Sequence, residues 1–338
     1  MVRICIDAMG GDYAPEAIVQ GCLDAVRDDT SLALTLFGKE EAIMPFLQKA
    51  GAEKERICIV DCADVIENNE HPVQAVRRKK EASVVKALRA LADGEGDGFV
   101  GAGSTGAVLA GATLIVKRIE GILRPALAPM LPTVTGTGVL LIDCGANVDC
   151  KPEWLAQFAV MGSVYMEKVR GTREPRVGIL NNGAEEGKGN ELVKNATPLI
   201  AQMPVHFTGN VEGRDITSGD VDVVVTDGFA GNVALKSIEG TAAMMTGMLK
   251  ETLLSSFRSK MGALLIKPAL SGFKKRMAYS EYGGAPLLGV NKPVVKAHGS
   301  SNAKAFYHAI HQCKQMVEGG VVPTIEAELA AVMKAEAK

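Results

Sequence analysis

The sequence is poor in aromatic residues and carries no large excess of either charge. Aromatic side chains make up 4% of the 338 residues, whereas glycine occurs 37 times. This combination favours an α/β protein with many tight turns over an all-β sandwich. The 37 basic residues are balanced by 39 acidic ones, which gives a net charge of −2. A chain built to coat nucleic acid would be strongly basic, so no nucleic-acid partner is expected.

Signals for disulfides, secretion and membrane spans are also missing. The seven cysteines are odd in number and include no C-x-x-C pair, so a reduced cytoplasmic protein is expected. The N-terminal segment MVRICIDAMGGD lacks the basic region and apolar core of a secretory signal. Charge or proline interrupts every apolar run before the roughly 18 residues that a membrane span needs.

Several catalytic motifs are absent as well. The chain contains no G-x-S-x-G elbow, no H-E-x-x-H and no Walker A lysine. His308 and His311 are three residues apart but have no nearby carboxylates or cysteines, so no metal site is expected. Cys144 and Cys150 are interpreted as buried structural thiols and not as nucleophiles.

What the sequence does contain is an alternation of short apolar runs with helical patterns. Continuous apolar runs bounded by Gly or Asp are typical of buried parallel strands, and the alternation predicts a doubly wound α/β sheet. No linker is evident, so residues 1–330 are expected to form one domain, followed by a tail at 331–338. The expected strands are 2–9, 32–38, 57–61, 98–102, 138–145, 176–183 and 222–228. The expected helices include 81–93, 105–118, 153–169, 187–202, 230–254 and 301–318.

The loop Gly101–Gly106 has the spacing G-x-G-x-x-G of a dinucleotide-binding turn. A true fingerprint needs a second strand that ends in an acidic residue about 20 residues later. Glu120 lies near that distance but precedes a glycine, and three prolines follow it within 12 residues. We therefore expect the loop to hold phosphate or another oxyanion instead of NAD. The alternative is a glycine-rich turn that only packs a helix against a strand.

Two further strand-end loops carry side chains suited to an anion or a carbonyl oxygen. Lys188 lies between glycines in EEGKGNEL, where its ammonium can neutralise phosphate or a developing oxyanion. Asn232 in TDGFAGNVALK offers two N–H donors and does not titrate. A solvated lysine is the ordinary alternative for Lys188. Asp7 is suited to anchoring loop amides or a cation, and Asp12 to capping a helix.

Taken together, these loops resemble the signature blocks of the bacterial phosphate acyltransferase family, the PlsX-type acyl-ACP:phosphate transacylases. The resemblance runs in order over nearly the whole chain, although Ser104 replaces the usual Asn and Asn182 stands where an apolar residue is common. The blocks are IDAMGGDYAPE, AGSTGA, RPALA, DCGANVDCKPEWLAQFAVMGSVYME, EEGKGNEL, FTGNVEGRDI and VDVVVTDGFAGNVALKSIEG.

The resemblance implies a reaction in which acyl-ACP and inorganic phosphate give acyl phosphate and free ACP. It also implies a homodimer, an α/β/α sandwich related to isocitrate and isopropylmalate dehydrogenases, no cofactor and no acyl-enzyme. The product would pass to a membrane glycerol-3-phosphate acyltransferase. Lys188 and Asn232 are the expected catalytic residues. The expected substrate and phosphate ligands are Asp7, Gly10, Gly11, Gly103, Ser104, Thr105, Gly106, Asn147, Asp227 and Gly231.

The segment 249–277, within a helical hairpin expected at about 241–277, is amphipathic and basic. Apolar residues recur at helical spacing from Leu249 to Leu264. Between Lys250 and Arg276 the sequence contains seven Lys or Arg residues and only one acidic residue. It could pack on the core or a dimer partner, steer acidic ACP, or dock on an anionic membrane at the inner face of the cell membrane. We favour the membrane. The expected contact residues are Lys250, Leu254, Phe257, Arg258, Lys260, Leu264, Leu265, Lys267, Lys274, Lys275 and Arg276.

Two rival functions remain. An NAD-dependent decarboxylating dehydrogenase on the same fold would need an aspartate cluster for a metal and a nicotinamide loop, and neither is identifiable. A non-enzymatic scaffold for lipid enzymes fits poorly with five strand-end loops of ligand-binding type, which are MGGDYAPE, GAGSTGA, DCGANVDCKPE, NNGAEEGKGNE and TDGFAGNVALK.

Overall fold

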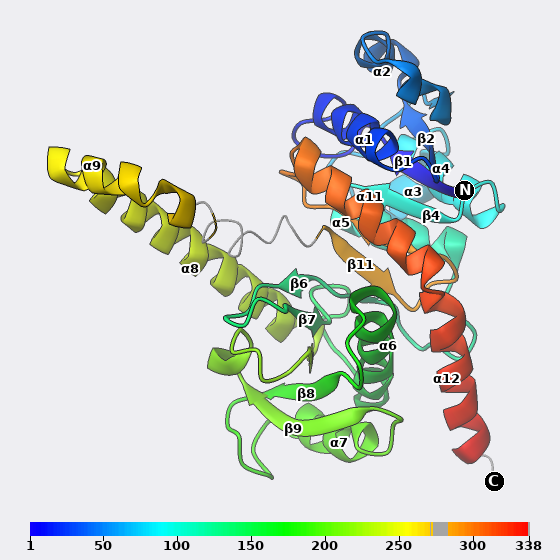
Figure 1. Ribbon diagram of the computed structural model, residues 1–338. Coiled ribbons are helices and arrows are strands. Elements are labelled where there is room, and N and C mark those ends of the chain that lie inside the picture. The colour runs from blue at the N-terminus through cyan, green and yellow to red at the C-terminus, as the bar shows by residue number, and fades with distance from the viewer. Residues whose placement is uncertain (271, 273–282, 337–338) are drawn as a thin grey trace.

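The structure, a computed structural model, describes residues 1–270, 272 and 283–336 and contains two β-sheets (Figure 1). The first sheet has seven strands. The four at one edge and the strand β12 run parallel, whereas β11 is antiparallel to both of its neighbours. In sheet order the strands are β3 (Ile57–Asp61), β2 (Leu32–Gly38), β1 (Val2–Asp7), β4 (Gly98–Gly101), β12 (Val294–Lys296), β11 (Ala285–Leu288) and β5 (Ala126–Leu127).

The second sheet has five strands. Along the chain, its first strand is separated by two residues from β5 of the first sheet. Its strands are parallel except β6, which is antiparallel to β7. In sheet order they are β6 (Met130–Leu131), β7 (Val139–Ile142), β10 (Val223–Val225), β8 (Arg176–Asn181) and β9 (His206–Glu212).

Helices cover both faces of each sheet. On the first sheet, α1 and α11 lie side by side on one face, and α4 packs with α3 and α5 on the other; on the second, α6 and α8 contact strands. The helices are α1 (Glu16–Asp28), α2 (Glu40–Leu47), α3 (Pro72–Arg78), α4 (Ser83–Ala92), α5 (Thr105–Gly111), α6 (Pro152–Arg170), α7 (Glu191–Ile200), α8 (Gly228–Leu254), α9 (Phe257–Leu265), α11 (Ala303–Glu318) and α12 (Val321–Glu336), with short turns η1 (Ala52–Arg56), η2 (Ala112–Val116) and η3 (Gly213–Asp215).

The predicted α/β class is confirmed, and each of the seven apolar runs holds a strand. These runs fold as strands because their side chains are buried between helical layers; Val139–Ile142 and Val223–Val225 are buried at every position. The strands divide between two sheets, which the alternation alone does not specify. Helix α12 extends to Glu336 and so includes most of the segment expected as a tail at 331–338.

The two sheets share a core. One cluster of buried side chains runs from α1 and α11 to α6, and it includes Phe306, Phe158 and the fully buried Tyr165. The Tyr165 hydroxyl accepts a hydrogen bond from Gln312 of α11 at 2.7 Å, so the polar tip of this buried ring is satisfied. This shared core fixes the strand ends of both sheets relative to one another.

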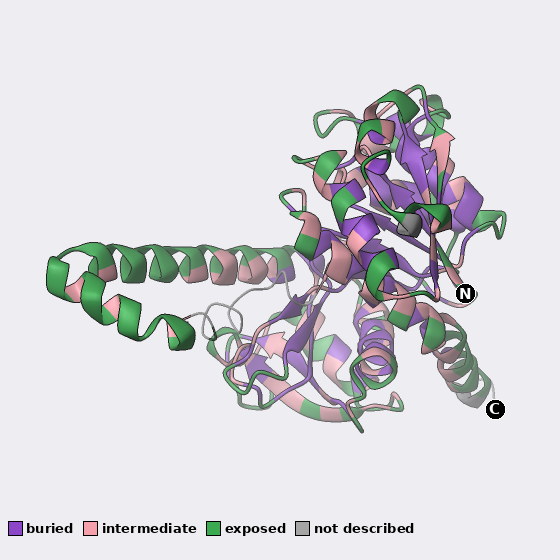
Figure 2. Ribbon diagram, turned by 45° about the horizontal axis from the view of Figure 1, so that its top comes forward, coloured by how far each residue is buried: buried purple, intermediate pink, exposed green. Residues whose placement is uncertain are grey.

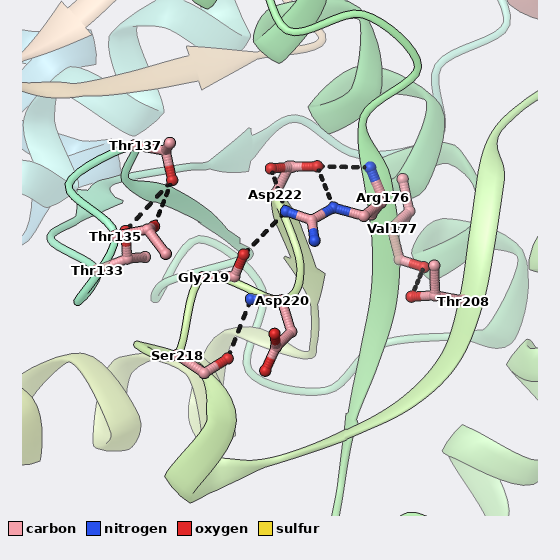
Figure 3. Close-up of polar contacts among 10 residues, drawn as sticks. All are labelled: Thr133, Thr135, Thr137, Arg176, Val177, Thr208, Ser218, Gly219, Asp220 and Asp222. Atoms are coloured by element: carbon pink, nitrogen blue, oxygen red, sulfur yellow. Dashed lines mark hydrogen bonds and ion pairs between the residues drawn. The ribbon is translucent and has the colours of Figure 1, made fainter.

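The end of the second sheet where β8 and β10 begin is held by an ion pair (Figure 3). Arg176 donates from Nε and Nη2 to the two carboxylate oxygens of Asp222 at 3.0 Å, and also to the Gly219 carbonyl. Nearby, hydroxyl groups of the loop between β6 and β7 contact one another at 2.9 to 3.3 Å. Those hydroxyls belong to Thr133, Thr135 and Thr137. These contacts lie at the strand starts, opposite the strand ends where α/β proteins bind ligands.

The expected helical hairpin projects from the body as α8 and α9 (Figure 1), and most of its residues are exposed (Figure 2). The apolar residues from Leu249 to Leu264 do not lie on one continuous helix, because α8 ends at Leu254. Ser256 caps α9 by accepting a hydrogen bond from the Ser259 amide. Phe257 and Leu265 are 79% and 81% exposed. Lys274, Lys275 and Arg276 lie outside the described residues. Within the part of the chain that the structure describes, no helix is both long and apolar enough to cross a membrane.

Candidate active site

A cavity of about 430 Å³ lies between the two sheets, at the carboxyl ends of β4, β7 and β12. Its lining contains both polar and apolar side chains. The polar ones are Thr105, Asn232, Lys236, Glu239, Lys296 and His298. The apolar ones are Leu109, Leu127, Pro129, Met130, Leu131 and Leu235.

Lys296, the last residue of β12, lines the cavity and is 6% exposed. Its ammonium donates to the carbonyls of Ala102, at 3.2 Å, and Ala297, at 2.5 Å. Burial lowers the pKa of Lys296 to about 8, although Asp7 and Asp12 act in the opposite direction. The position of a lysine at the end of a buried strand therefore places a cation inside the cavity.

His298 follows two residues later and also lines the cavity. The Ser300 amide donates to its Nδ1 at 3.2 Å, so the neutral ring carries its proton on Nε2. Burial lowers the pKa of His298 below its usual value. At neutral pH the ring is therefore a hydrogen-bond donor and not a charge.

The first turns of α8 form the opposite wall. Asn232 lines the cavity, and so do Lys236 and Glu239, which pair at 2.7 Å. The helix starts here because Asp227 accepts hydrogen bonds from the amides of Phe229 and Ala230. The predicted ligand Asp227 thus serves as a helix cap, while the predicted catalytic Asn232 faces the cavity.

Beneath Asn232, a buried carboxylate organises the loop that follows β7. Asp143 is fully buried and accepts from the amides of Leu127, Ala146 and Asn147 and from the Asn147 side chain. Burial raises the pKa of Asp143 to about 6 despite these four bonds. A Cβ on Gly231 would lie 2.0 Å from the Asp143 carbonyl, so only glycine fits there. Gly231 and Asn147, both predicted ligands, hold the wall of the cavity.

The glycine-rich turns after β1 and β4 pack directly against one another. A Cβ on Gly10 would lie 2.4 Å from the Gly103 nitrogen, so the close approach requires glycine. Asp7 is buried and accepts from the Ser83 hydroxyl at 2.7 Å. Gly11 has a φ of 105°, a conformation that favours glycine. Asp7, Gly10, Gly11 and Gly103 therefore form the support behind the cavity.

The residues after Gly103 reach the cavity itself. The Ser104 hydroxyl caps α5 by accepting from the Ala107 amide at 3.5 Å, whereas Thr105 and Gly106 line the cavity. Gly106 also packs tightly on Pro72 of α3, where a Cβ would lie 2.5 Å from the proline ring. Thr105 and Gly106, the last two residues of the predicted G-x-G-x-x-G loop, therefore face the space where a ligand would bind.

Lys188 lies on the exposed loop after β8 and is not among the residues that line the cavity. Its carbonyl accepts from the Asn181 side chain at 3.2 Å, and its amide donates to Glu185. Because β8 and β10 are neighbouring parallel strands, this loop and the start of α8 lie at the same edge of the sheet. Contact between Lys188 and a ligand beside Asn232 would require the lysine side chain or its loop to move.

The cavity offers no activated nucleophile. Cys144 lines it, but burial raises the pKa of this thiol well above its usual value, so the thiolate is disfavoured. Among the described residues, no group of three or more His, Cys, Asp or Glu side chains is placed to hold a metal ion. Cationic and N–H-bearing side chains suit an anion, and the apolar side chains in the same lining suit an acyl chain.

Comparison with known proteins shows the family to which the chain belongs. A family model described as a fatty acid synthesis protein matches residues 2–324. The phosphate acyltransferase of Bacillus cereus (strain G9842) is 54% identical over 326 residues, which cover 96% of this chain and 98% of the relative. The chain belongs to the phosphate acyltransferase family. This acyltransferase therefore acts in fatty acid and phospholipid synthesis, as the sequence blocks predicted.

Solved structures support the fold. A phosphotransacetylase from Streptococcus pyogenes superposes with a TM-score of 0.64 at 18% identity and covers 94% of both chains. A putative 4-hydroxythreonine-4-phosphate dehydrogenase from Salmonella typhimurium superposes with a TM-score of 0.52 at 12% identity, covering 94% of this phosphate acyltransferase and 99% of the other chain. The predicted kinship with the dehydrogenase-like fold is thus confirmed.

Sequence reasoning did not select Lys296, His298 or Asp143 of this phosphate acyltransferase. A signal existed for the first two, because the segment VVKAHGSS places a lysine and a histidine directly after a short apolar run. The strand β12 in this segment has only three residues, which is too short for a strand to be predicted from the sequence. Asp143 stands at the end of a predicted strand, but nothing in the sequence indicates that four N–H groups converge on it.

Proposed function

We propose that this phosphate acyltransferase transfers a fatty acyl group from acyl-ACP to inorganic phosphate, giving acyl phosphate and free ACP. The observation that carries the proposal is a cavity whose lining combines lysines and hydrogen-bond donors with a set of apolar side chains. Phosphate fits beside Lys296, and the acyl chain fits the wall from Leu127 to Leu131. The thioester carbon then lies between them, near Asn232.

The reaction needs no covalent acyl-enzyme. A phosphate oxygen attacks the thioester carbonyl carbon, a C–O bond forms, and the C–S bond breaks with its electron pair on sulfur. The carrier thiolate is a stable leaving group. Asn232 donates to the carbonyl oxygen as it becomes negative, and Lys188 approaches from the neighbouring loop to neutralise charge. An apolar wall keeps water from the product, which hydrolyses readily.

The projecting hairpin would place the enzyme at the membrane surface. As a homodimer at the inner face of the cell membrane, the cytoplasmic protein would deliver acyl phosphate to a membrane glycerol-3-phosphate acyltransferase. Exposed Phe257, Leu264 and Leu265 suit the lipid interface, and Arg258 and Lys260 suit anionic headgroups. The same basic residues can attract acidic ACP.

The test of the reaction is phosphate-dependent release of the carrier thiol. Purified enzyme, acyl-ACP and phosphate should release thiol at a rate that saturates with phosphate, while acyl phosphate accumulates. Replacing phosphate by sulfate should stop the release. If thiol release were equal with and without phosphate, the protein would be a thioesterase and the proposal would fail. NAD with a 2-hydroxy acid should give no absorbance change.

A further inference from the structure

Among the residues that the structure describes, the buried Lys296 has no carboxylate partner. Its ammonium has three N–H donors, and two of them are used on the carbonyls of Ala102 and Ala297. Within the described residues, no carboxylate forms an ion pair with it, and Asp7 acts on it only at longer range. A buried charge is costly unless an opposite charge accompanies it. The site therefore lacks one negative group.

The other charged groups around Lys296 do not supply that charge from within the cavity. On α8, Glu239 is already paired with Lys236 at 2.7 Å. Asp7 of β1 is buried behind the glycine turns, where burial raises the pKa of its carboxyl, and Asp12 lies in the following loop. His298 contributes no negative charge. Among the described residues that line the cavity, Lys236 and Lys296 face one acid, Glu239, which leaves an excess of one cation.

We propose that Lys296 is a catalytic residue that binds the substrate phosphate directly through its third N–H. This inference rests on the proposed function and names the group at which the phosphate is held. The ammonium accompanies the phosphate oxygens through attack on the thioester and remains with the acyl phosphate product. His298, two residues along, presents its Nε2 proton on the same side of the cavity.

The assignment has a consequence that a merely structural lysine would not show. With a pKa of about 8, Lys296 is mostly unprotonated at pH 9, where inorganic phosphate is already a dianion. A bound dianion favours the ammonium, so phosphate binding at pH 9 should draw about one proton onto the enzyme. Calorimetry in two buffers of different ionisation enthalpy measures that uptake.

The variants are Lys296→Met, which keeps the length and removes the charge, and Lys296→Arg, which keeps the charge but does not titrate in this range. Both should lose the proton uptake at pH 9. Lys296→Met should also weaken phosphate binding about 10- to 100-fold, as expected for a lost charged hydrogen bond. Lys292→Met, at the start of the same strand segment, is the matched control and should behave as wild type. His298→Gln should keep the uptake.

The outcomes separate the two proposals. Proton uptake that persists in Lys296→Met, or wild-type phosphate binding in that variant, overturns the inference. If wild-type enzyme releases carrier thiol but Lys296→Met does so with an unchanged KM for phosphate, the inference alone fails. If wild-type enzyme binds phosphate with uptake lost in both variants yet releases no thiol, the inference holds and the proposed reaction is wrong.

Discussion

The charge on Lys296 should cost the free enzyme stability, and the cost should depend on pH. Burial lowers the pKa of this lysine from 10.5 to about 8, so the folded state holds the proton less tightly than the unfolded state. The penalty is fully present below pH 8 and disappears as the pH rises toward 10.5. Wild-type enzyme should therefore gain stability relative to Lys296→Met over this range.

The size of the effect follows from the two pKa values. Between pH 7 and pH 9.5, linkage gives a change of about 2 kcal/mol in the difference between the two proteins' unfolding free energies. Hydrogen bonds lost at the two carbonyls shift that difference by an amount that does not vary with pH, so only the change is diagnostic. The assay is urea unfolding of both proteins at each pH without phosphate. A difference that stays constant within about 0.5 kcal/mol, the usual limit of such comparisons, would refute the view that Lys296 is charged where it lies buried.

The remaining predictions concern the two predicted catalytic residues and the hairpin. Asn232→Ala should lower kcat about 100- to 1,000-fold, which is the usual cost of losing one oxyanion donor, while its melting temperature stays that of wild type. Lys188→Ala should lower kcat by a factor in the same range. A near wild-type kcat in either variant would remove that residue from the site. Joint reversal of Arg258, Lys260 and Lys267 to Glu should abolish sedimentation with anionic liposomes and keep kcat. A raised KM for acyl-ACP with intact sedimentation would instead favour steering, and no change in either would favour packing.

Most of the fold followed from burial patterns that are visible in the sequence. Runs such as Val139–Ile142 are apolar at every position because helices cover both faces of the sheet. Most of the missed strands are short or lie beside antiparallel neighbours, as with Ala285–Leu288, which contains a proline. The exception is β9, a seven-residue strand at the edge of its sheet with only one fully buried position. The division into two sheets depends on which strands pair, and pairing between distant segments leaves no local signal.

The site was predicted less completely, for a chemical reason. Oxygen-bearing side chains at strand ends cap helices as readily as they bind ligands, and Asp227 and Ser104 are engaged as caps. Asn232 and Thr105 do line the cavity. Lys296 was missed because a buried lysine is rare enough that a strand-end lysine is normally interpreted as solvated.

In the proposed reaction, phosphate attacks the thioester directly, without an acyl-enzyme. The most direct measurement mixes acyl-ACP with an excess of enzyme in the absence of phosphate and follows both the released thiol and the intact mass of the protein. Direct attack predicts no thiol release above the background without enzyme and no change in mass, followed by prompt release when phosphate is added. Release of one thiol per acyl-ACP before phosphate, with an acyl group added to the enzyme at Cys144 or elsewhere, would contradict it.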